Sequence, residues 1–120
     1  MPGRIFLVED SVMVSGAIRM LLEASGYEVD LAATAADAIA VDASTPHDLM
    51  LLDLTLPDAD GLSVIGGLAA RGLLPRSVLA LTGHADLATR QRCIAAGCDE
   101  VLVKPVPLRQ LLQLIAERMA

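Results

Sequence analysis

The sequence predicts an α/β fold in which five parallel strands form one doubly wound sheet that is flanked by five helices. Short, apolar, β-rich segments alternate five times with longer segments of helical periodicity, and only a few residues connect each pair. Such alternation is typical of parallel strands joined by right-handed crossovers. A chain of 120 residues also suits one domain, and we expect a single domain over residues 1–120.

The predicted strands differ in their apolar pattern. Four are apolar almost throughout, as expected of strands covered on both faces, whereas EVDLA alternates and is typical of an edge strand. The length fits the flavodoxin-like strand order 2-1-3-4-5, which places a site at the C-terminal ends of the strands, beside the switch point between the first and the third. The predicted strands lie near residues 4–8, 28–32, 48–54, 77–82 and 100–103.

Apolar residues recur at helical spacing in the segments that separate and follow the strands. One face of the first such segment holds Val14, Ala17, Ile18 and Leu21. The last segment shows the pattern i, i+3, i+4 and i+7 at Leu108, Leu111, Leu112 and Ile115. Three further helices are predicted over residues 35–43, 61–70 and 86–96.

The helix boundaries are marked by residues that favour the start or the end of a helix. Gly26, Gly72 and Gly97 each follow a predicted helix, as glycine commonly does at a C-terminus. Asp86 is predicted to cap the fourth helix, and Pro107 suits the first turn of the fifth.

The composition excludes several classes of function. A net charge of −6 repels a phosphate backbone, and one Phe, one Tyr and no Trp leave no platform for stacking bases, so direct nucleic-acid binding is not expected. The sequence has neither an apolar run of roughly 20 residues nor a secretory signal, so we expect a cytoplasmic protein with no membrane contact. Cys93 and Cys98 lack zinc-site spacing and are interpreted as small buried thiols.

Polar side chains occur where four of the predicted strands end. Glu9 and Asp10 follow the first strand, Asp53 the third, Thr82 the fourth and Lys104 the fifth. Because these ends share one edge of a parallel sheet, we expect the side chains to converge. Two carboxylates about 4 Å apart repel by about 4 kcal/mol near a protein surface. Mg²⁺ would remove that cost, since it binds one or two carboxylates and accepts phosphate oxygens.

Asp53 is the residue that we expect to be modified. A carboxylate directly after two leucines loses hydration unless it lies at a strand end, is paired or holds a cation. Lys104, the only lysine, can pair with an anion, and the Thr82 hydroxyl can donate a hydrogen bond to the same group. These residues predict a pocket for a phosphoryl group on Asp53, with its carboxylate as nucleophile.

The same residues also have simpler interpretations when each is taken alone. Asp10 could cap the first helix, with Ser11 as the alternative cap, and Asp53 could be a loop-entry residue. Thr82 before Gly83 could belong to an ordinary turn. Their expected convergence at the switch point favours a shared site over these separate roles.

Four motifs in order, FLVEDS, LLDLTLPDADGL, LALTGHAD and VLVKPV, resemble those of the CheY-like receiver domains of two-component response regulators, and the resemblance covers the whole chain. It implies that Asp53 accepts a phosphoryl group from a sensor histidine kinase or a histidine phosphotransfer protein. It also implies that Asp10, Asp53 and the backbone carbonyl of Thr55 hold Mg²⁺, with Glu9 assisting through water.

The resemblance assigns roles to two further strand ends. Thr82 and Lys104 would contact the phosphoryl group and relay the switch, and the Lys104–Pro105 bond would be cis. Val101 departs from the family pattern, because most receivers have Tyr or Phe three residues before the lysine. The aromatic switch is therefore missing, which leaves open the output route through the fourth helix, the fifth strand and the fifth helix.

The sequence does not identify the output. We find no DNA-binding or enzymatic segment after the fifth helix, so we expect either a stand-alone receiver or a domain cut from a longer protein. Its target would then be an unknown downstream protein or a covalently linked output domain. A dimer through the fourth and fifth helices rests on family analogy alone.

Several polar residues near the motifs are given structural roles. Asp58 and Asp60 are expected to shape the loop and the start of the third helix, with Gly61 easing the turn. His84 is interpreted as an exposed loop residue at the edge of the site, and His47 as a turn residue.

Three alternatives compete with a phosphorylated switch that has no turnover on an external substrate. A haloacid-dehalogenase-like phosphohydrolase would need a second Asp where Thr55 stands, and a cap domain. A flavodoxin-like cofactor binder would need a loop rich in Ser, Thr and Gly after the first strand, where this chain has the acidic EDS. A receiver-like interaction module that is never phosphorylated is disfavoured by the intact acidic set. Val101, in place of the usual aromatic residue, nevertheless leaves this alternative open.

Overall fold

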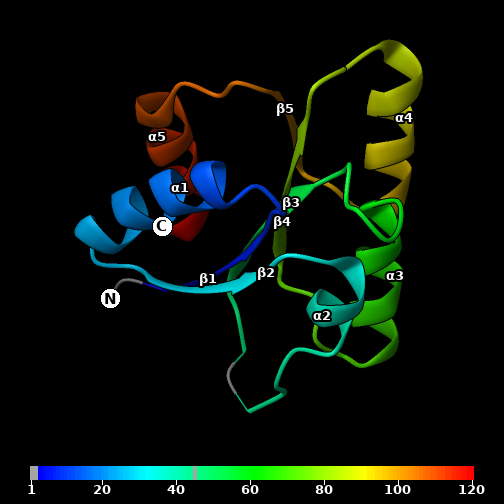
Figure 1. Ribbon diagram of the computed structural model, residues 1–120, viewed down its shortest axis with the longest axis horizontal. Helices are drawn as coiled ribbons and strands as arrows, with labels where there is room; N and C mark the ends of the chain where they lie inside the picture. The colour runs from blue at the N-terminus through cyan, green and yellow to red at the C-terminus, as the bar shows by residue number, and fades with distance from the viewer. Residues whose placement is uncertain (1–2, 45) are drawn as a thin grey trace.

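A computed structural model describes residues 3–44 and 46–120 and contains the expected five-stranded sheet (Figure 1). Its order is β2-β1-β3-β4-β5, and every pairing is parallel. The predicted flavodoxin-like topology is therefore confirmed. The strands are β1 (Arg4–Val8), β2 (Glu28–Ala32), β3 (Leu49–Asp53), β4 (Ser77–Thr82) and β5 (Glu100–Val103).

Five helices cover the two faces of the sheet. One face carries α1 (Val12–Ala24) and α5 (Leu108–Met119), and the other carries α2 (Ala35–Ile39), α3 (Leu62–Ala70) and α4 (Leu87–Ala96) (Figure 1). Neighbouring residues of β1 alternate between the two layers, as the period of a strand requires. Ile5 and Leu7 join the cluster under α1 and α5, and Phe6 and Val8 join the cluster under α2, α3 and α4. Within the described residues, no helix has the length and apolarity to cross a membrane.

The strands differ in burial according to their place in the sheet. β3 and β4 are buried throughout, whereas β2 is an edge strand, as predicted. Its burial does not follow the alternation of its sequence, because Val29 and Ala32 are buried but Leu31 is exposed. β5 was expected to be covered on both faces, and that expectation is wrong. Its residues are half-buried or exposed, because β5 is the opposite edge strand and pairs only with β4.

The buried face of α1 differs from the predicted one. Ile18 is buried as expected, but its buried neighbours on the helix are Ser15 and Leu22. Ala17, which was assigned to this face, is exposed, and Val14 is half-buried against the same cluster. The stripe still follows the helical period, so the helix was predicted correctly and its rotation on the sheet was not.

The second helix is shorter than the prediction of residues 35–43, since it ends at Ile39. The Arg71 guanidinium donates hydrogen bonds to the carbonyls of Ile39 and Val41. Asp42 Oδ1 accepts a hydrogen bond of 2.9 Å from the Ser44 N–H. These partners satisfy backbone groups outside a helix, which lets the chain leave the helical path early despite its alanine content.

The boundary signals of three glycines and of Asp86 are confirmed, whereas Pro107 is the N-cap of α5 and not a residue of its first turn. Gly26, Gly72 and Gly97 have φ values of 95°, 69° and 108°, a region that residues with a side chain rarely adopt. Asp86 is the N-cap of α4, and its Oδ1 accepts a hydrogen bond of 2.8 Å from the Thr89 N–H.

Candidate functional site

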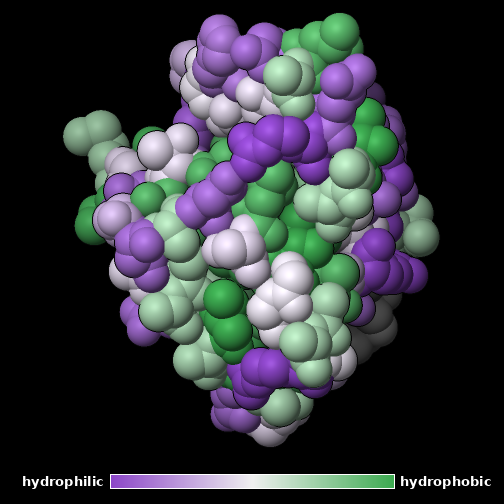
Figure 2. Space-filling view, turned by 90° about the vertical axis from the view of Figure 1, so that its right-hand side faces the viewer, coloured by the Kyte–Doolittle hydropathy of each residue, from purple (hydrophilic) through white to green (hydrophobic). Residues whose placement is uncertain are grey.

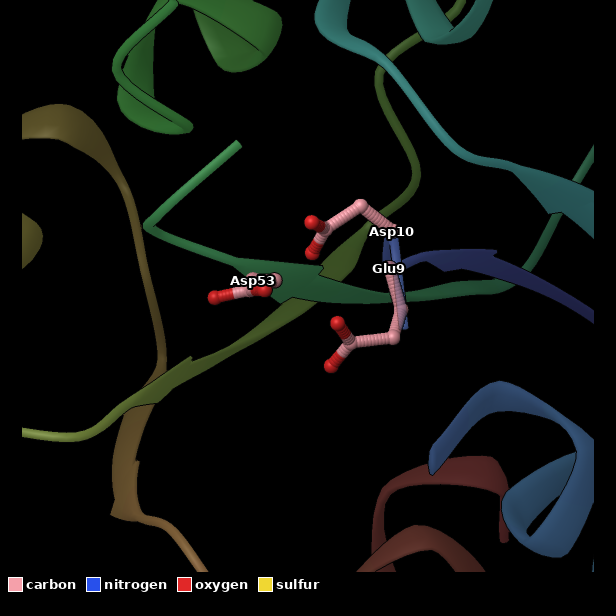
Figure 3. Close-up of side chains that lie close together, drawn as sticks. All are labelled: Glu9, Asp10 and Asp53. Atoms are coloured by element: carbon pink, nitrogen blue, oxygen red, sulfur yellow. The ribbon is translucent and has the colours of Figure 1, made fainter. Parts of the chain in front are cut away.

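Three carboxylates lie together at the C-terminal ends of β1 and β3 (Figure 3). Glu9 and Asp10 directly follow β1, and Asp53 is the last residue of β3. The two strands end side by side because Val8 pairs with Leu52. One oxygen of each carboxylate lies within 4.8 Å of the other two. The structure thus brings the predicted acidic residues into one cluster.

Lys104 is the cation that faces this cluster. Its ammonium lies 2.7 Å from Glu9 Oε1 and 3.1 Å from Asp53 Oδ2. Glu9 and Asp53 are only 2% and 3% exposed, so each would lose much of its hydration without a partner. The lysine follows β5, and its backbone N–H donates a hydrogen bond of 2.8 Å to the carbonyl of Thr82. The Lys104–Pro105 bond is cis, as expected.

Two groups of the site have shifted pKa values. Burial is the main reason that the pKa of Glu9 is raised, and the neighbouring Asp53 adds to the rise against the opposing Lys104 hydrogen bond. Burial lowers the pKa of Lys104, but its contacts with Glu9 and Asp53 outweigh burial, so the net pKa is raised. The lysine therefore stays charged at neutral pH, while negative charge in the cluster is only partly compensated.

The first helix is capped by Ser11, one of the two predicted candidates. Its Oγ accepts a hydrogen bond of 3.3 Å from the Val14 N–H. Asp10 is thus not the cap of α1, and its exposed carboxylate belongs to the acidic cluster. The carboxylate of Glu9 accepts a hydrogen bond of 3.1 Å from the Ser11 N–H, which also fixes the start of this loop.

Thr82 lies at the end of β4 and is buried. Its hydroxyl donates a hydrogen bond of 3.0 Å to the carbonyl of His84 and accepts one of 3.1 Å from the His84 N–H. The predicted hydrogen bond from Thr82 to a phosphoryl group would require the hydroxyl to leave that carbonyl. The side chain of His84 is exposed, as interpreted, and pairs with Asp86.

The loop after β3 packs directly on the Asp53 backbone. The Thr55 N–H donates a hydrogen bond of 3.0 Å to Asp53 Oδ1, and a backbone bridge joins Thr55 to Asp60. The Gly61 N–H donates a hydrogen bond of 2.9 Å to the carbonyl of Leu54. A Cβ at Gly61 would lie 2.2 Å from the Asp53 carbonyl oxygen. Glycine is therefore required at position 61 because the backbone there lies so close to the Asp53 carbonyl, a contact that the sequence alone did not indicate.

The two aspartates of this loop have different partners. Asp60 Oδ1 accepts a hydrogen bond of 3.0 Å from the Leu62 N–H at the start of α3, as predicted. Asp58 was assigned to the same region, and that assignment is wrong. Its carboxylate accepts hydrogen bonds of 2.8 and 3.0 Å from the N–H groups of Ala35 and Ala36, so it binds the first turn of α2.

His47 is not merely a turn residue, as the sequence suggested. Its side chain is 3% exposed and its ring stacks on Phe6 with centroids 4.7 Å apart. Its Nε2 lies 2.8 Å from Asp30 Oδ2. This contact is the main reason that the pKa of Asp30 is held below its usual value. His47 thus joins β2 to the core, away from the acidic cluster.

The two cysteines are buried and free, which agrees with their interpretation as small apolar residues. Burial raises the pKa of both thiols, in the case of Cys98 to about 12.

Val101 packs against the apolar cluster between the sheet and α2, α3 and α4. Figure 2 views the molecule from the side of α3 and α4, where hydrophobic surface lies between hydrophilic residues.

An apolar groove of about 520 Å³ lies beside the site, between α1 and α5. Lys104 contributes to its lining together with apolar side chains such as Ile18 and Leu111. Met13 and Leu108 also line it and are 85% and 39% exposed. The groove therefore opens to solvent next to the lysine that faces Asp53.

The donor set of the cluster is suited to a magnesium ion. Carboxylate oxygens are hard ligands, and Mg²⁺ characteristically binds one or two of them. Burial chiefly raises the pKa of Glu9, and the neighbouring Asp53 adds to the rise, as expected where carboxylates lie close together. Asp10, Asp53 and Glu9 therefore fit a divalent cation by chemistry and by charge.

Sequence comparisons connect this chain with a known family. The family model for the response regulator receiver domain matches residues 5–116. The transcriptional regulatory protein KdpE of Mycobacterium tuberculosis is 34% identical over 108 residues, which cover 90% of this chain and 47% of that protein. The response regulator MprA of Mycolicibacterium vanbaalenii is 37% identical over 113 residues, with coverages of 93% and 48%. The chain spans about half the length of the curated relatives it matches.

Solved structures share the whole fold. A response regulator receiver domain protein (CheY-like) from Methanospirillum hungatei JF-1 has a TM-score of 0.88 at 32% identity, covering 99% of this chain and 94% of its own. The receiver domain of the sensor histidine kinase PA1611 from Pseudomonas aeruginosa PAO1 has a TM-score of 0.83 at 28% identity, with coverages of 99% and 98%. That structure has a magnesium ion coordinated in its active site cleft.

Proposed function

Because this chain belongs to the family of response regulator receiver domains, we propose that it is a phosphorylation-dependent switch whose phosphoacceptor is Asp53. The observation that carries this proposal is the position of Asp53 at the end of β3, beside the carboxylates of Glu9 and Asp10 and in contact with the ammonium of Lys104. It acts as an acceptor and switch rather than as an enzyme with turnover on an external substrate.

The acceptor carboxylate is oriented by two contacts. The Thr55 N–H binds Oδ1 and the Lys104 ammonium faces Oδ2. An oxygen of Asp53 attacks the phosphorus of a phosphohistidine, and the phosphorus–nitrogen bond breaks. The electron pair of that bond returns to the imidazole, which takes a proton from solvent. The product is an acyl phosphate on Asp53, formed by nucleophilic displacement.

Asp10, Asp53 and the backbone carbonyl of Thr55 would hold Mg²⁺, with Glu9 acting through water. When bound, the ion neutralises charge on the carboxylates and on the phosphoryl oxygens. Lys104 would then exchange its contact with Glu9 for a phosphoryl oxygen. The Thr82 hydroxyl would turn from the His84 carbonyl to the same group, a change that rearranges the loop after β4.

The phosphoryl donor is a sensor histidine kinase or a histidine phosphotransfer protein. Its reactive imidazole must reach Asp53, and the apolar groove between α1 and α5 offers it a contact surface beside Lys104. Met13→Glu at the rim would slow transfer from a phosphorylated kinase while leaving reaction with acetyl phosphate unchanged. Equal rates from the kinase for Met13→Glu and wild type would contradict this contact.

The output is a change in binding to a downstream protein or to a linked domain. KdpE is named a transcriptional regulatory protein, and this chain matches about half of its length. Any DNA binding would come from a linked domain, because the net charge of −6 opposes direct contact with a phosphate backbone.

Beryllofluoride, a phosphoryl mimic, tests the acceptor site. Fluorine NMR should show bound beryllofluoride only when Mg²⁺ is present. Binding should be lost in Asp53→Asn and weakened in Asp10→Asn, whereas Asp37→Asn on the exposed face of α2 should behave as wild type. Undiminished binding in Asp53→Asn would contradict the assignment of the acceptor.

A further inference from the structure

The loop between β3 and α3 is attached to α4 by an ion pair. Asp60, in the loop, pairs through its Oδ2 with the guanidinium of Arg92, on α4. The two side chains are 50% and 58% exposed, so the pair lies at the surface between the two elements. Its partners are 32 residues apart in sequence, and the motifs of the acceptor site do not include Arg92.

Contacts inside the loop continue from this ion pair to the phosphoacceptor. Asp60 is joined to Thr55 by a backbone bridge, and the Thr55 N–H donates its hydrogen bond of 3.0 Å to Asp53 Oδ1. Gly61 packs on the Asp53 carbonyl, where there is no room even for a Cβ. A displacement of Asp60 would therefore move the N–H group that orients the acceptor carboxylate.

We propose that Arg92 is a positioning residue for the phosphoacceptor: through Asp60 it holds the loop whose Thr55 N–H orients Asp53, and it links the acceptor to α4. The inference rests on the proposed function of Asp53. It gives α4 a connection to the site that does not pass through Val101, where the family's aromatic side chain is missing. To couple α4 to phosphorylation, the Asp60–Arg92 interaction must differ in free energy between the unmodified and the phosphorylated states of Asp53.

A second arginine of α4 provides a matched control. Arg90 lies two residues before Arg92, and its Nε donates a hydrogen bond of 3.1 Å to the carbonyl of Ala85. It therefore binds the chain before α4 rather than the loop between β3 and α3. Arg90→Gln removes the same charge from the same helix and leaves the Asp60 contact in place.

The effect of the ion pair is modest in size and sensitive to salt. Exposed ion pairs contribute little free energy, so we expect Arg92→Gln or Asp60→Asn to weaken beryllofluoride binding by about two- to fivefold. At about 1 M salt the interaction is screened over roughly 3 Å, and the difference from wild type should shrink. Arg92→Lys keeps the charge and should restore most of the affinity.

A double-mutant cycle tests the proposal. Beryllofluoride dissociation constants at saturating Mg²⁺ are measured for wild type, Asp60→Asn, Arg92→Gln and the double variant, with Arg90→Gln as control and circular dichroism to confirm folding. We expect the double variant to be no weaker than the weaker single variant, because both changes remove the same contact. Arg90→Gln should match wild type.

The outcomes separate this inference from the proposed function. If wild type fails to bind beryllofluoride, the proposed function fails and this inference fails with it. If wild type binds and the two single effects multiply in the double variant, or neither variant differs from wild type, only the role of Arg92 is overturned. An equal loss in Arg90→Gln would also overturn it, because the effect would then come from the charge of the helix.

Discussion

The Lys104 ammonium lies 3.1 Å from Oδ2 of Asp53, so the residue expected to bind the phosphoryl group already contacts the acceptor. Their side chains are 27% and 4% exposed, which leaves the aspartate dependent on the lysine for charge compensation. The contact arises because β3 and β5 end at the same edge of the sheet, on either side of β4. We therefore expect both the stability of the fold and the proposed reactivity of Asp53 to depend on this pair.

Replacement of Lys104 by methionine should destabilise the metal-free protein. Glu9 and Asp53 would remain buried without their cation, and we expect the free energy of unfolding to fall by about 1–3 kcal/mol. Urea denaturation with and without Mg²⁺ measures the effect, and the ion should restore part of the loss. Arg109→Met on the exposed side of α5 is the control. Equal stability of Lys104→Met and wild type would show that the lysine does not compensate the cluster.

Gly61→Ala should destabilise the protein, whereas Gly66→Ala should not. The added methyl group at position 61 would meet the Asp53 carbonyl at 2.2 Å, which forces the acceptor loop to move at a cost of about 1–3 kcal/mol. At Gly66, in α3, nothing lies within 4 Å of the added atom, and alanine should stabilise the helix by roughly 0.5–1 kcal/mol. Thermal unfolding compares the two. Similar shifts in both variants would contradict the close packing of Gly61 on Asp53.

The contribution of the His47–Asp30 contact to folding stability should depend on pH. The His47 hydrogen bond lowers the pKa of Asp30 in the folded state below its ordinary value of 3.8. The contribution of Asp30 is therefore fully present above pH 3.8 and is lost as pH falls through the lower, folded value. Asp30→Asn should reduce stability at pH 6, and its difference from wild type should shrink in acid. A difference that is independent of pH would contradict a lowered pKa of Asp30 in the folded state.

The cysteines should be unreactive in the folded protein. Cys93 and Cys98 are 0% and 7% exposed, and burial raises the pKa of Cys98 to about 12, so little thiolate is present at neutral pH. Ellman's reagent should label the native protein slowly and both thiols at once in strong denaturant. Rapid labelling without denaturant would mean that the end of α4 opens readily.

Local patterns in the sequence predicted the sheet and the acidic site because both depend on where apolar runs end. Asp53 and Lys104 could be placed together once their strands were expected to be parallel. The partners of His47 could not be found in this way, since Phe6 and Asp30 come from two other strands. The early end of α2 likewise depends on Arg71, which is distant in the chain and reaches the helix only in the folded state.

The loop after β3 also combines features that a local pattern predicts with contacts that depend on the folded structure. Its aspartates and glycine were predicted to shape a turn, which is a local property. The contacts of Asp58 with α2 and of Asp60 with Arg92 join elements that no short motif connects. They depend on how α2 and α4 pack on the same face of the sheet.

The most direct test is to locate the phosphoryl group. Wild type and Asp53→Asn are incubated with acetyl phosphate, with Mg²⁺ or with a chelator, and intact masses are recorded. Borohydride reduction then converts an aspartyl phosphate to homoserine, which marks the modified residue in a peptide digest. We expect one added phosphoryl group, dependent on Mg²⁺, with homoserine at position 53 and no adduct in Asp53→Asn. An adduct at another residue, or a wild-type protein that gains no adduct and also fails to bind beryllofluoride, would contradict phosphorylation at Asp53.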